Sequence, residues 1–153
     1  MPPLRPLLLA AALSVGGCAQ RPLDATPEGS ARELVERMRR VHGDPAEARA
    51  AFDLLSKRAR DNLAERAARY GAASGKSIAP EAMIVPSRFS LRFEPQRYEA
   101  QVSGALAQVT VRGELPEHEA PIMCVLEEGR WRVDMALPSL PPVQQRPGSD
   151  APR

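Results

Sequence analysis

The spacing of hydrophobic residues changes once along this chain, near residue 86. Before that point, apolar residues recur every three or four positions, which is the period of an amphipathic helix. After it, they alternate with polar residues, as in a strand that buries one face. Helices followed by strands, in a chain of 153 residues, indicate one α+β domain. We expect two to three N-terminal helices packed on a curved antiparallel sheet of four to five strands.

The helical part begins with recognisable start and stop signals. The residues that can cap helix N-termini are Thr26, Asp44 and Ser56, and proline takes the first helical position after the first two of them. Glycines mark the ends: we expect Gly43 to end the first helix and Gly71 to end the third. The predicted helical ranges are 27–42, a short helix from 45, 57–70 with Tyr70 facing inward, and one turn over 80–84.

The remaining residues predict an antiparallel meander. Ser103-Gly104 and Glu128-Gly129 have the composition of tight hairpin turns. Trp131 and Val133 alternate with arginines, which places them on one face of the last strand. Cys124 lies in an apolar run and is expected in the core. The predicted strands cover residues 87–93, 98–102, 105–112, 121–127 and 130–135.

The first 17 residues have the layout of a secretory signal. Arg5 precedes an apolar run over 7–13, far shorter than the roughly 20 residues needed to cross a bilayer. The run ends in Leu13-Ser14-Val15-Gly16-Gly17-Cys18. This stretch resembles the lipobox of bacterial lipoproteins, which implies cleavage between Gly17 and Cys18 and a lipid on the Cys18 thiol. In such lipoproteins an Asp after the cysteine favours inner-membrane retention, so Ala19 implies the periplasmic face of the outer membrane.

These features predict four segments in the chain. They are a signal peptide (1–17), the lipidated cysteine with a tether (18–26), the α+β domain (27–137) and a Pro-rich disordered tail (138–153). With Cys18 lipidated, Cys124 has no cysteine left to pair with. The alternative is an ordinary secreted protein with a Cys18–Cys124 disulfide.

The order of elements carries a second resemblance. Its residues are Thr26-Pro27-Glu28, His42-Gly43-Asp44-Pro45, Leu54-Leu55-Ser56, Ser103-Gly104 and the run from Glu127 to Asp134. They resemble the nuclear-transport-factor-2-like, or cystatin-like, superfamily, and most of all its small bacterial lipoproteins. The resemblance implies a cone, in which a strongly curved sheet wraps round the helices and leaves a pocket. It does not specify a function, because that fold serves both enzymes and binding domains.

Residues suited to catalysis or metal binding are few. The chain has two histidines, of which His42 adjoins a helix end. His118 lies in Glu117-His118-Glu119, where neighbouring side chains of an extended segment point to opposite faces and do not share one ion. We therefore expect no metal and no cofactor. Asp134 is the residue to test for an acid–base enzyme, and we expect it on the face of the sheet opposite Trp131.

The function we expect is that of a non-enzymatic lipoprotein, anchored through Cys18, that binds an envelope partner protein or a small apolar ligand. The alternatives are an isomerase- or dehydratase-like enzyme using the cone pocket, and a dimerisation module using the outer face of the sheet as a homodimer interface. The candidate pocket or core residues are Trp131, Tyr98 and Phe52. Nucleic acid is not an expected partner, because 21 basic and 19 acidic residues are interspersed along the chain.

Overall fold

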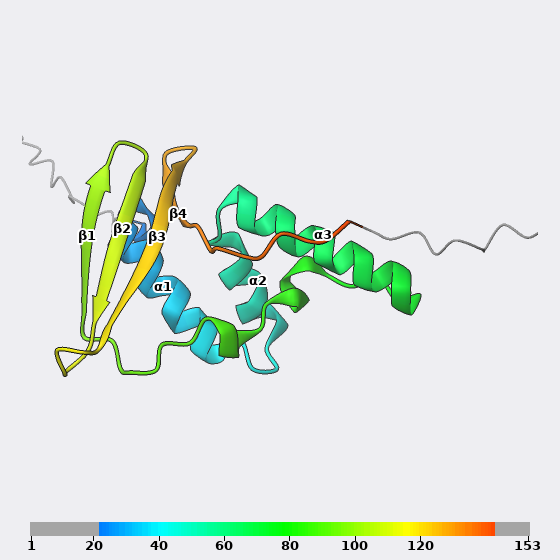
Figure 1. The fold of residues 1–153 in the computed structure, drawn as a ribbon, viewed down its shortest axis with the longest axis horizontal. Coiled ribbons are helices and arrows are strands. Elements are labelled where there is room, and N and C mark those ends of the chain that lie inside the picture. The colour runs from blue at the N-terminus through cyan, green and yellow to red at the C-terminus, as the bar shows by residue number, and fades with distance from the viewer. Residues whose placement is uncertain (1–21, 143–153) are drawn as a thin grey trace, which may run out of the picture.

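The computed structural model describes residues 22–142, which form three helices followed by a four-stranded antiparallel sheet (Figure 1). This confirms the α+β class and the order predicted from the change of period. Gly17 and Cys18 lie outside the described residues. The elements are η1 (Leu23–Ala25), α1 (Pro27–Arg40), α2 (Pro45–Asp53), α3 (Lys57–Ser74), η2 (Pro80–Met83), η3 (Pro86–Arg88), β1 (Arg97–Ser103), β2 (Leu106–Arg112), β3 (Glu119–Glu127) and β4 (Arg130–Val133).

All three predicted helix caps are present. The Thr26 hydroxyl accepts a hydrogen bond from the Gly29 amide at 3.1 Å, and the Asp44 carboxylate accepts from Ala46 and Glu47. The Ser56 hydroxyl accepts from the Ala59 amide at 3.2 Å. Each bond satisfies a backbone N–H that has no partner within the first turn of its helix. These helix starts are therefore dictated locally.

The predicted end of the third helix is wrong. α3 continues through Gly71 to Ser74 and ends at Gly75, whose φ of +68° suits a residue without a side chain. Glycine inside a helix costs only about 1 kcal/mol, and a Cβ on Gly71 would lie 2.8 Å from the Lys76 carbonyl oxygen. Gly71 thus permits a close backbone approach. Tyr70 is 61% exposed, so the prediction that it faces inward is also wrong.

The sheet is a meander in the order β1-β2-β3-β4, with every neighbouring pair antiparallel. The β3–β4 turn places both Glu128 and Gly129 at positive φ, 51° and 76°, as tight hairpin turns of this kind require. The predicted strand over 87–93 is wrong, because this segment contains η3 and then irregular backbone. Phe89, Leu91 and Phe93 do pack against the core. These three residues alternate with polar ones because one side of the segment faces the core. The segment does not pair with a strand.

The hydrophobic core lies between α1 and one face of the sheet. α1 contacts all four strands, whereas α2 and α3 lie to the side of the sheet (Figure 1). The Ser30 hydroxyl, buried on α1, donates to the Trp131 carbonyl at 2.7 Å and so ties the helix to β4. The buried side chains at this interface are Ala31, Leu34 and Met38 on the helix and Ala107, Val109, Val111, Cys124, Trp131 and Val133 on the sheet.

The α2–α3 connection is attached to the last strand. Leu55 forms a parallel bridge with Val133. The Ser56 amide donates to the Val133 carbonyl at 2.8 Å, and the Val133 amide donates to the Leu54 carbonyl at 2.9 Å. These bonds set the position of α3 relative to the sheet.

Cys124 has the core position predicted for it and is only 1% exposed. Burial raises the pKa of its thiol to about 12, with the nearby charges of Glu28 and Asp134 adding to the effect. The thiolate is the reactive form of cysteine. Its population is therefore negligible in the folded protein at ordinary pH.

We predict that a chain beginning at residue 19, in which Cys124 is the only cysteine, resists alkylation while folded. Iodoacetamide at about pH 8, near the ordinary thiol pKa, should label it slowly in buffer and completely in guanidinium chloride. Mass spectrometry would count the labels. Rapid labelling of the folded chain would contradict the buried position.

Candidate functional site

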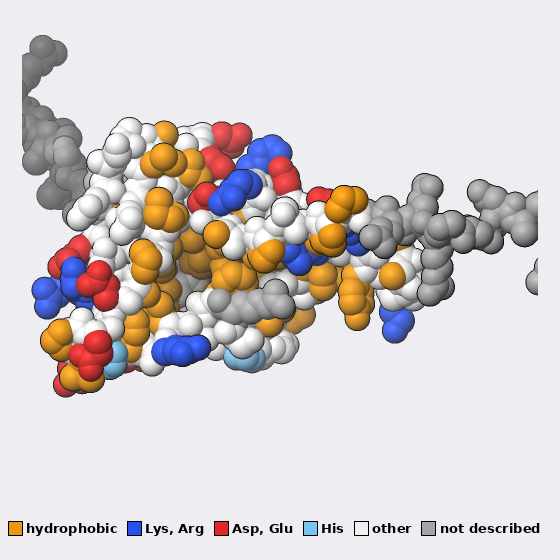
Figure 2. Space-filling model, in the orientation of Figure 1, with side chains coloured by type: hydrophobic (Ala, Val, Ile, Leu, Met, Phe, Trp, Pro, Cys, Tyr) orange, Lys and Arg blue, Asp and Glu red, His pale blue; other side chains and the backbone are white. Residues whose placement is uncertain are grey.

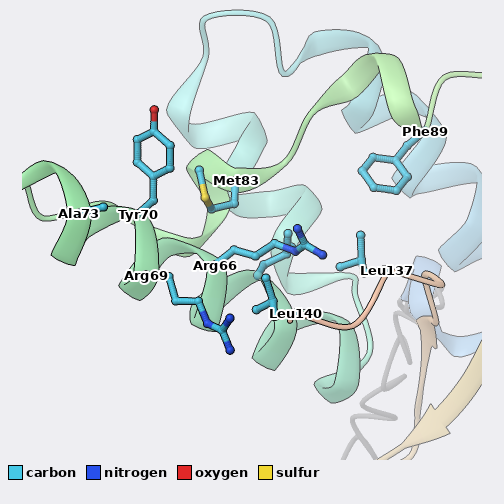
Figure 3. Close-up of a pocket in the computed structure, with 9 residues that line it drawn as sticks. Arg66, Arg69, Tyr70, Ala73, Met83, Phe89, Leu137 and Leu140 are labelled. Carbon is cyan, nitrogen blue, oxygen red and sulfur yellow. The ribbon is translucent and has the colours of Figure 1, made fainter. Parts of the chain in front are cut away.

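An apolar groove lies on one face of the molecule, and its two lobes are both lined by Phe89. The first, the α3 lobe, has a volume of about 390 Å³ and lies between α3, Met83 of η2 and the C-terminal segment (Figure 3). The second, the sheet lobe, has a volume of about 420 Å³ and lies between α1, β3 and the residues after β4. Figure 2 shows hydrophobic side chains gathered in the middle of this face, between the sheet and α3.

The α3 lobe follows from the spacing of residues on one helix. Leu63, Arg66, Tyr70 and Ala73 recur at three- and four-residue intervals and so share one face of α3. Neither the sheet nor α1 covers the C-terminal half of that face. Tyr70 and Ala73 therefore remain exposed beside the lobe.

The C-terminal segment forms the other wall of the α3 lobe. Leu137 and Leu140 line it (Figure 3). The segment is held through backbone carbonyls: Arg66 donates to the Pro138 oxygen at 2.6 Å, and Arg69 donates to that of Pro141. Proline has no N–H to offer, so such a segment binds through its acceptors. The first residues of the range predicted as a disordered tail, 138–142, thus lie along α3, while 143–153 are outside the described residues.

The sheet lobe opens where α1 leaves part of β3 uncovered. Leu34, Val35 and Met38 of α1 form one side, and residues 120–123 of β3 form the other. The segment 89–91 and the segment 133–136 complete the walls. The sheet lobe is therefore lined mainly by aliphatic, aromatic and methionine side chains.

The charged groups at the edges of the groove are already paired within the protein. Arg66 also donates to Asn62, and Arg69 also pairs with Glu65. Asp134, at the sheet lobe, accepts hydrogen bonds from Ser56 and Arg58. Sites for small molecules are typically concave, mostly apolar and of about 300–1,000 Å³. The groove has that character.

Asp134 is placed as a structural carboxylate. Its Oδ1 accepts from the Ser56 hydroxyl at 2.6 Å, and its two oxygens accept from the Arg58 guanidinium at 3.1 and 2.7 Å. Burial by itself would raise the pKa of Asp134, but the hydrogen bonds from Arg58 and Ser56 and the charge of Arg58 together lower it. A general base needs a pKa near the working pH. The pKa of Asp134 is lowered, which moves it away from the value that a general base would need.

The residues predicted to line a pocket or the core do not line the groove. Trp131 and Phe52 are buried in the hydrophobic core. Tyr98 packs against that core under the guanidinium of Arg32, 5.1 Å from its ring centre, and burial raises its pKa. The groove residue Phe89 was missed because its segment was interpreted as a strand. Leu140 was missed because it lies among prolines, although an apolar residue there was a usable signal.

Neither histidine lines the two lobes of the groove, although His42 lines a smaller adjoining cavity of about 230 Å³ that Phe89 also lines. The ring of His118 stacks on Phe93 with centroids 5.2 Å apart, and the neighbouring Glu119 pairs with Arg112. His42 is exposed beyond the end of α1. Within residues 22–142, no three His, Cys, Asp or Glu side chains are grouped in a way that could hold a metal ion.

Comparisons with protein-family models, with curated proteins and with solved structures find no match to this chain. The resemblances to lipoproteins and to the nuclear-transport-factor-2-like superfamily therefore stay predictions. Among the helices of residues 22–142, none combines the length and the apolar character needed to cross a membrane.

Asp134→Asn should destabilise the fold by about 1 kcal/mol near neutral pH, because it weakens a charged hydrogen-bond acceptor shared by α3 and β4. The folded pKa is lowered, so the stabilisation is present above the ordinary value of about 4 and is lost as pH falls below it. Urea unfolding of both proteins across this range should show the difference shrinking with acid.

Asp53→Asn is the matched control, because Asp53 is exposed and its ion pair with Arg49 lies within a single helix. Such pairs contribute little to stability. A difference between wild type and Asp134→Asn that grows as pH falls would contradict the role assigned to Asp134.

Proposed function

We propose that this chain is a lipid-anchored, non-enzymatic protein of the bacterial cell envelope that binds a small apolar ligand in the groove around Phe89. The observation that carries the proposal is the groove itself, with its two apolar lobes and its charged neighbours already paired. The lipobox-like sequence ending at Cys18 supports the location. Ala19 favours the periplasmic face of the outer membrane.

Burial of apolar ligand surface would drive binding. Transfer of apolar surface from water contributes about 25 cal/mol per Å². Phe89 lies at the junction of the two lobes, so a ligand longer than one lobe would contact it from both sides. The guanidinium groups of Arg66 and Arg69 lie at the rim of the α3 lobe (Figure 3). Because these guanidinium groups are already held by Asn62, Glu65 and backbone carbonyls, a predominantly apolar ligand fits this arrangement best.

The alternative of an isomerase- or dehydratase-like enzyme has less support. Such chemistry needs an acid–base pair facing the substrate. Asp134 borders the sheet lobe, but both of its oxygens are occupied by Ser56 and Arg58. No described histidine lines the sheet lobe beside it.

The alternative of dimerisation through the outer face of the sheet also has less support. Arg112 on that face pairs with Glu99 on β1 and with Glu119 on β3. A row of ion pairs across three strands is typical of a face in contact with water, because burying it would require the removal of water from every charge.

Filling the groove should abolish ligand binding. Ala73→Trp on α3 places an indole at the α3 lobe, and Ala136→Trp does the same at the sheet lobe; both alanines are exposed. We expect the neutral dye N-phenylnaphthylamine to bind the wild type with increased fluorescence. At least one variant should bind it about tenfold more weakly, equivalent to about 1.4 kcal/mol.

Ala64→Trp is the matched control, since Ala64 is exposed on the same helix and lines neither lobe. It should bind the dye like the wild type. Absence of saturable binding in the wild type, or equal binding by all variants, would rule out the groove as an apolar site and would favour a protein partner on another surface.

The lipid anchor is tested separately. Cys18→Ala should accumulate as an uncleaved precursor and should fail to incorporate radiolabelled palmitate in a bacterial host, because the thioether requires the thiol. Cys124→Ala is the control, since that thiol is buried, and it should label normally. Normal labelling of Cys18→Ala would contradict lipidation at this residue.

A further inference from the structure

The residues just after the proposed lipidation site are fixed to the domain. Asp24 of η1 is buried, and its Oδ2 accepts hydrogen bonds from Arg130 and Arg132 of β4, both at 3.1 Å. η1 also packs so closely on α1 that a Cβ on Gly29 would lie 1.9 Å from the Leu23 carbonyl oxygen. Only glycine fits there. Residues 22–26, predicted as part of the tether, therefore belong to the folded body.

The remaining link to Cys18 is short. Only residues 19–21 lie between Cys18 and Pro22, the first described residue. Four residue steps reach at most about 14 Å even when fully extended. A lipid on Cys18 would therefore hold the domain against the membrane by the surface that surrounds η1.

That surface is one end of the sheet. η1 contacts β4, and Asp24 pairs with Arg130, the first residue of that strand. The register places the β1–β2 turn and the β3–β4 turn at this same end, with Ser103 opposite Leu106 and Leu106 opposite Val125. Figure 1 shows the two turns together at the top of the sheet and the 113–118 loop at the bottom.

Exposed hydrophobic side chains gather at this end. Leu23 and Val102 are each 57% exposed, Leu106 is 56% exposed and Leu126 is 38% exposed. We call these four residues the apolar rim. Hydrophobic side chains are visible on the same end of the sheet in Figure 2. Exposed hydrophobic residues that gather around one point of attachment commonly mark an interaction surface.

The charged residues beside the apolar rim do not favour binding to a membrane surface of anionic lipids. Glu127 ends β3 and Glu128 lies in the β3–β4 turn, near Arg130, which is paired with Asp24. The carboxylate of Glu127 accepts from the Lys57 amide. An attraction to anionic lipids needs a cluster of unpaired basic residues. Contact here would rest on hydrophobic insertion.

We propose that the apolar rim rests on the bilayer that carries the Cys18 lipid, so that the protein stands on its hairpin end with the 113–118 loop pointing away. This inference rests on the proposed lipid anchor. The anchor makes contact with the bilayer intramolecular, so a few apolar side chains suffice where they would be too weak alone. The sheet lobe includes residues 120–123, toward the other end of β3, and stays open to a ligand.

The test compares two fluorophore positions on the mature lipidated protein in phosphatidylcholine vesicles. Ala105→Cys lies in the β1–β2 turn and Glu117→Cys lies in the opposite loop; both positions are exposed. A thiol-reactive dye should label only the introduced cysteine, because Cys18 carries the lipid and Cys124 is buried. Vesicles containing nitroxide-labelled lipid should quench the dye at residue 105 several-fold more than the dye at residue 117.

A pair of variants assigns the contact to the apolar rim. Leu106→Ser combined with Leu126→Ser should reduce quenching at residue 105 to the level seen at residue 117. Leu115→Ser is the matched control, since Leu115 is 48% exposed in the opposite loop; it should leave quenching unchanged. High salt should leave it unchanged as well.

Vesicle flotation separates the two proposals. If the protein does not float with the vesicles, the lipid anchor has failed. If it floats but both dyes are quenched equally, the anchor stands and the orientation is overturned. Quenching at residue 105 that needs anionic lipid and disappears in high salt would also overturn contact through the apolar rim.

Discussion

The packing of α1 on one face of the sheet is the interaction on which the rest of the structure depends. A four-stranded sheet cannot remain with both faces in water when one of them carries Val109, Val111 and Trp131. α1 covers this face with Ala31, Leu34 and Met38. The hydrogen bond from the Ser30 hydroxyl to the Trp131 carbonyl satisfies a buried donor and sets where along the sheet the helix lies.

The placement of α1 also determines what lies at its two ends. At its N-terminus, η1 is held against β4 by Asp24 and passes over Gly29, which places η1 beside the start of β4. Toward its C-terminus, α1 leaves part of β3 uncovered, and the sheet lobe opens there. The proposed membrane contact and the proposed ligand site are thus at different ends of one helix–sheet interface.

How much could be predicted depended on the range of the interaction that decides each feature. The caps at Thr26, Asp44 and Ser56 and the positive φ at Gly43 involve neighbouring residues, and all were predicted. The end of α3 was misplaced because Gly71 does not end the helix. A glycine is needed there because the Lys76 backbone approaches it closely. The segment over 87–93 was misread because Phe89 and Leu91 alternate against the core without pairing with a strand. The groove was not predicted, since its walls come from segments far apart in the chain.

The sequence by itself determined the α+β class, the order of helices and strands and the buried face of β4, because hydrophobic period and capping residues act over a few positions. The lipobox-like segment can also be recognised from the sequence, because the predicted lipidation depends on a few adjacent residues. Only the tertiary structure decided that Asp134 is tied to Ser56 and Arg58, and that residues 138–142 lie along α3. It alone showed that residues 22–26 join the domain. These features depend on contacts between residues separated by dozens of positions, which no local pattern records.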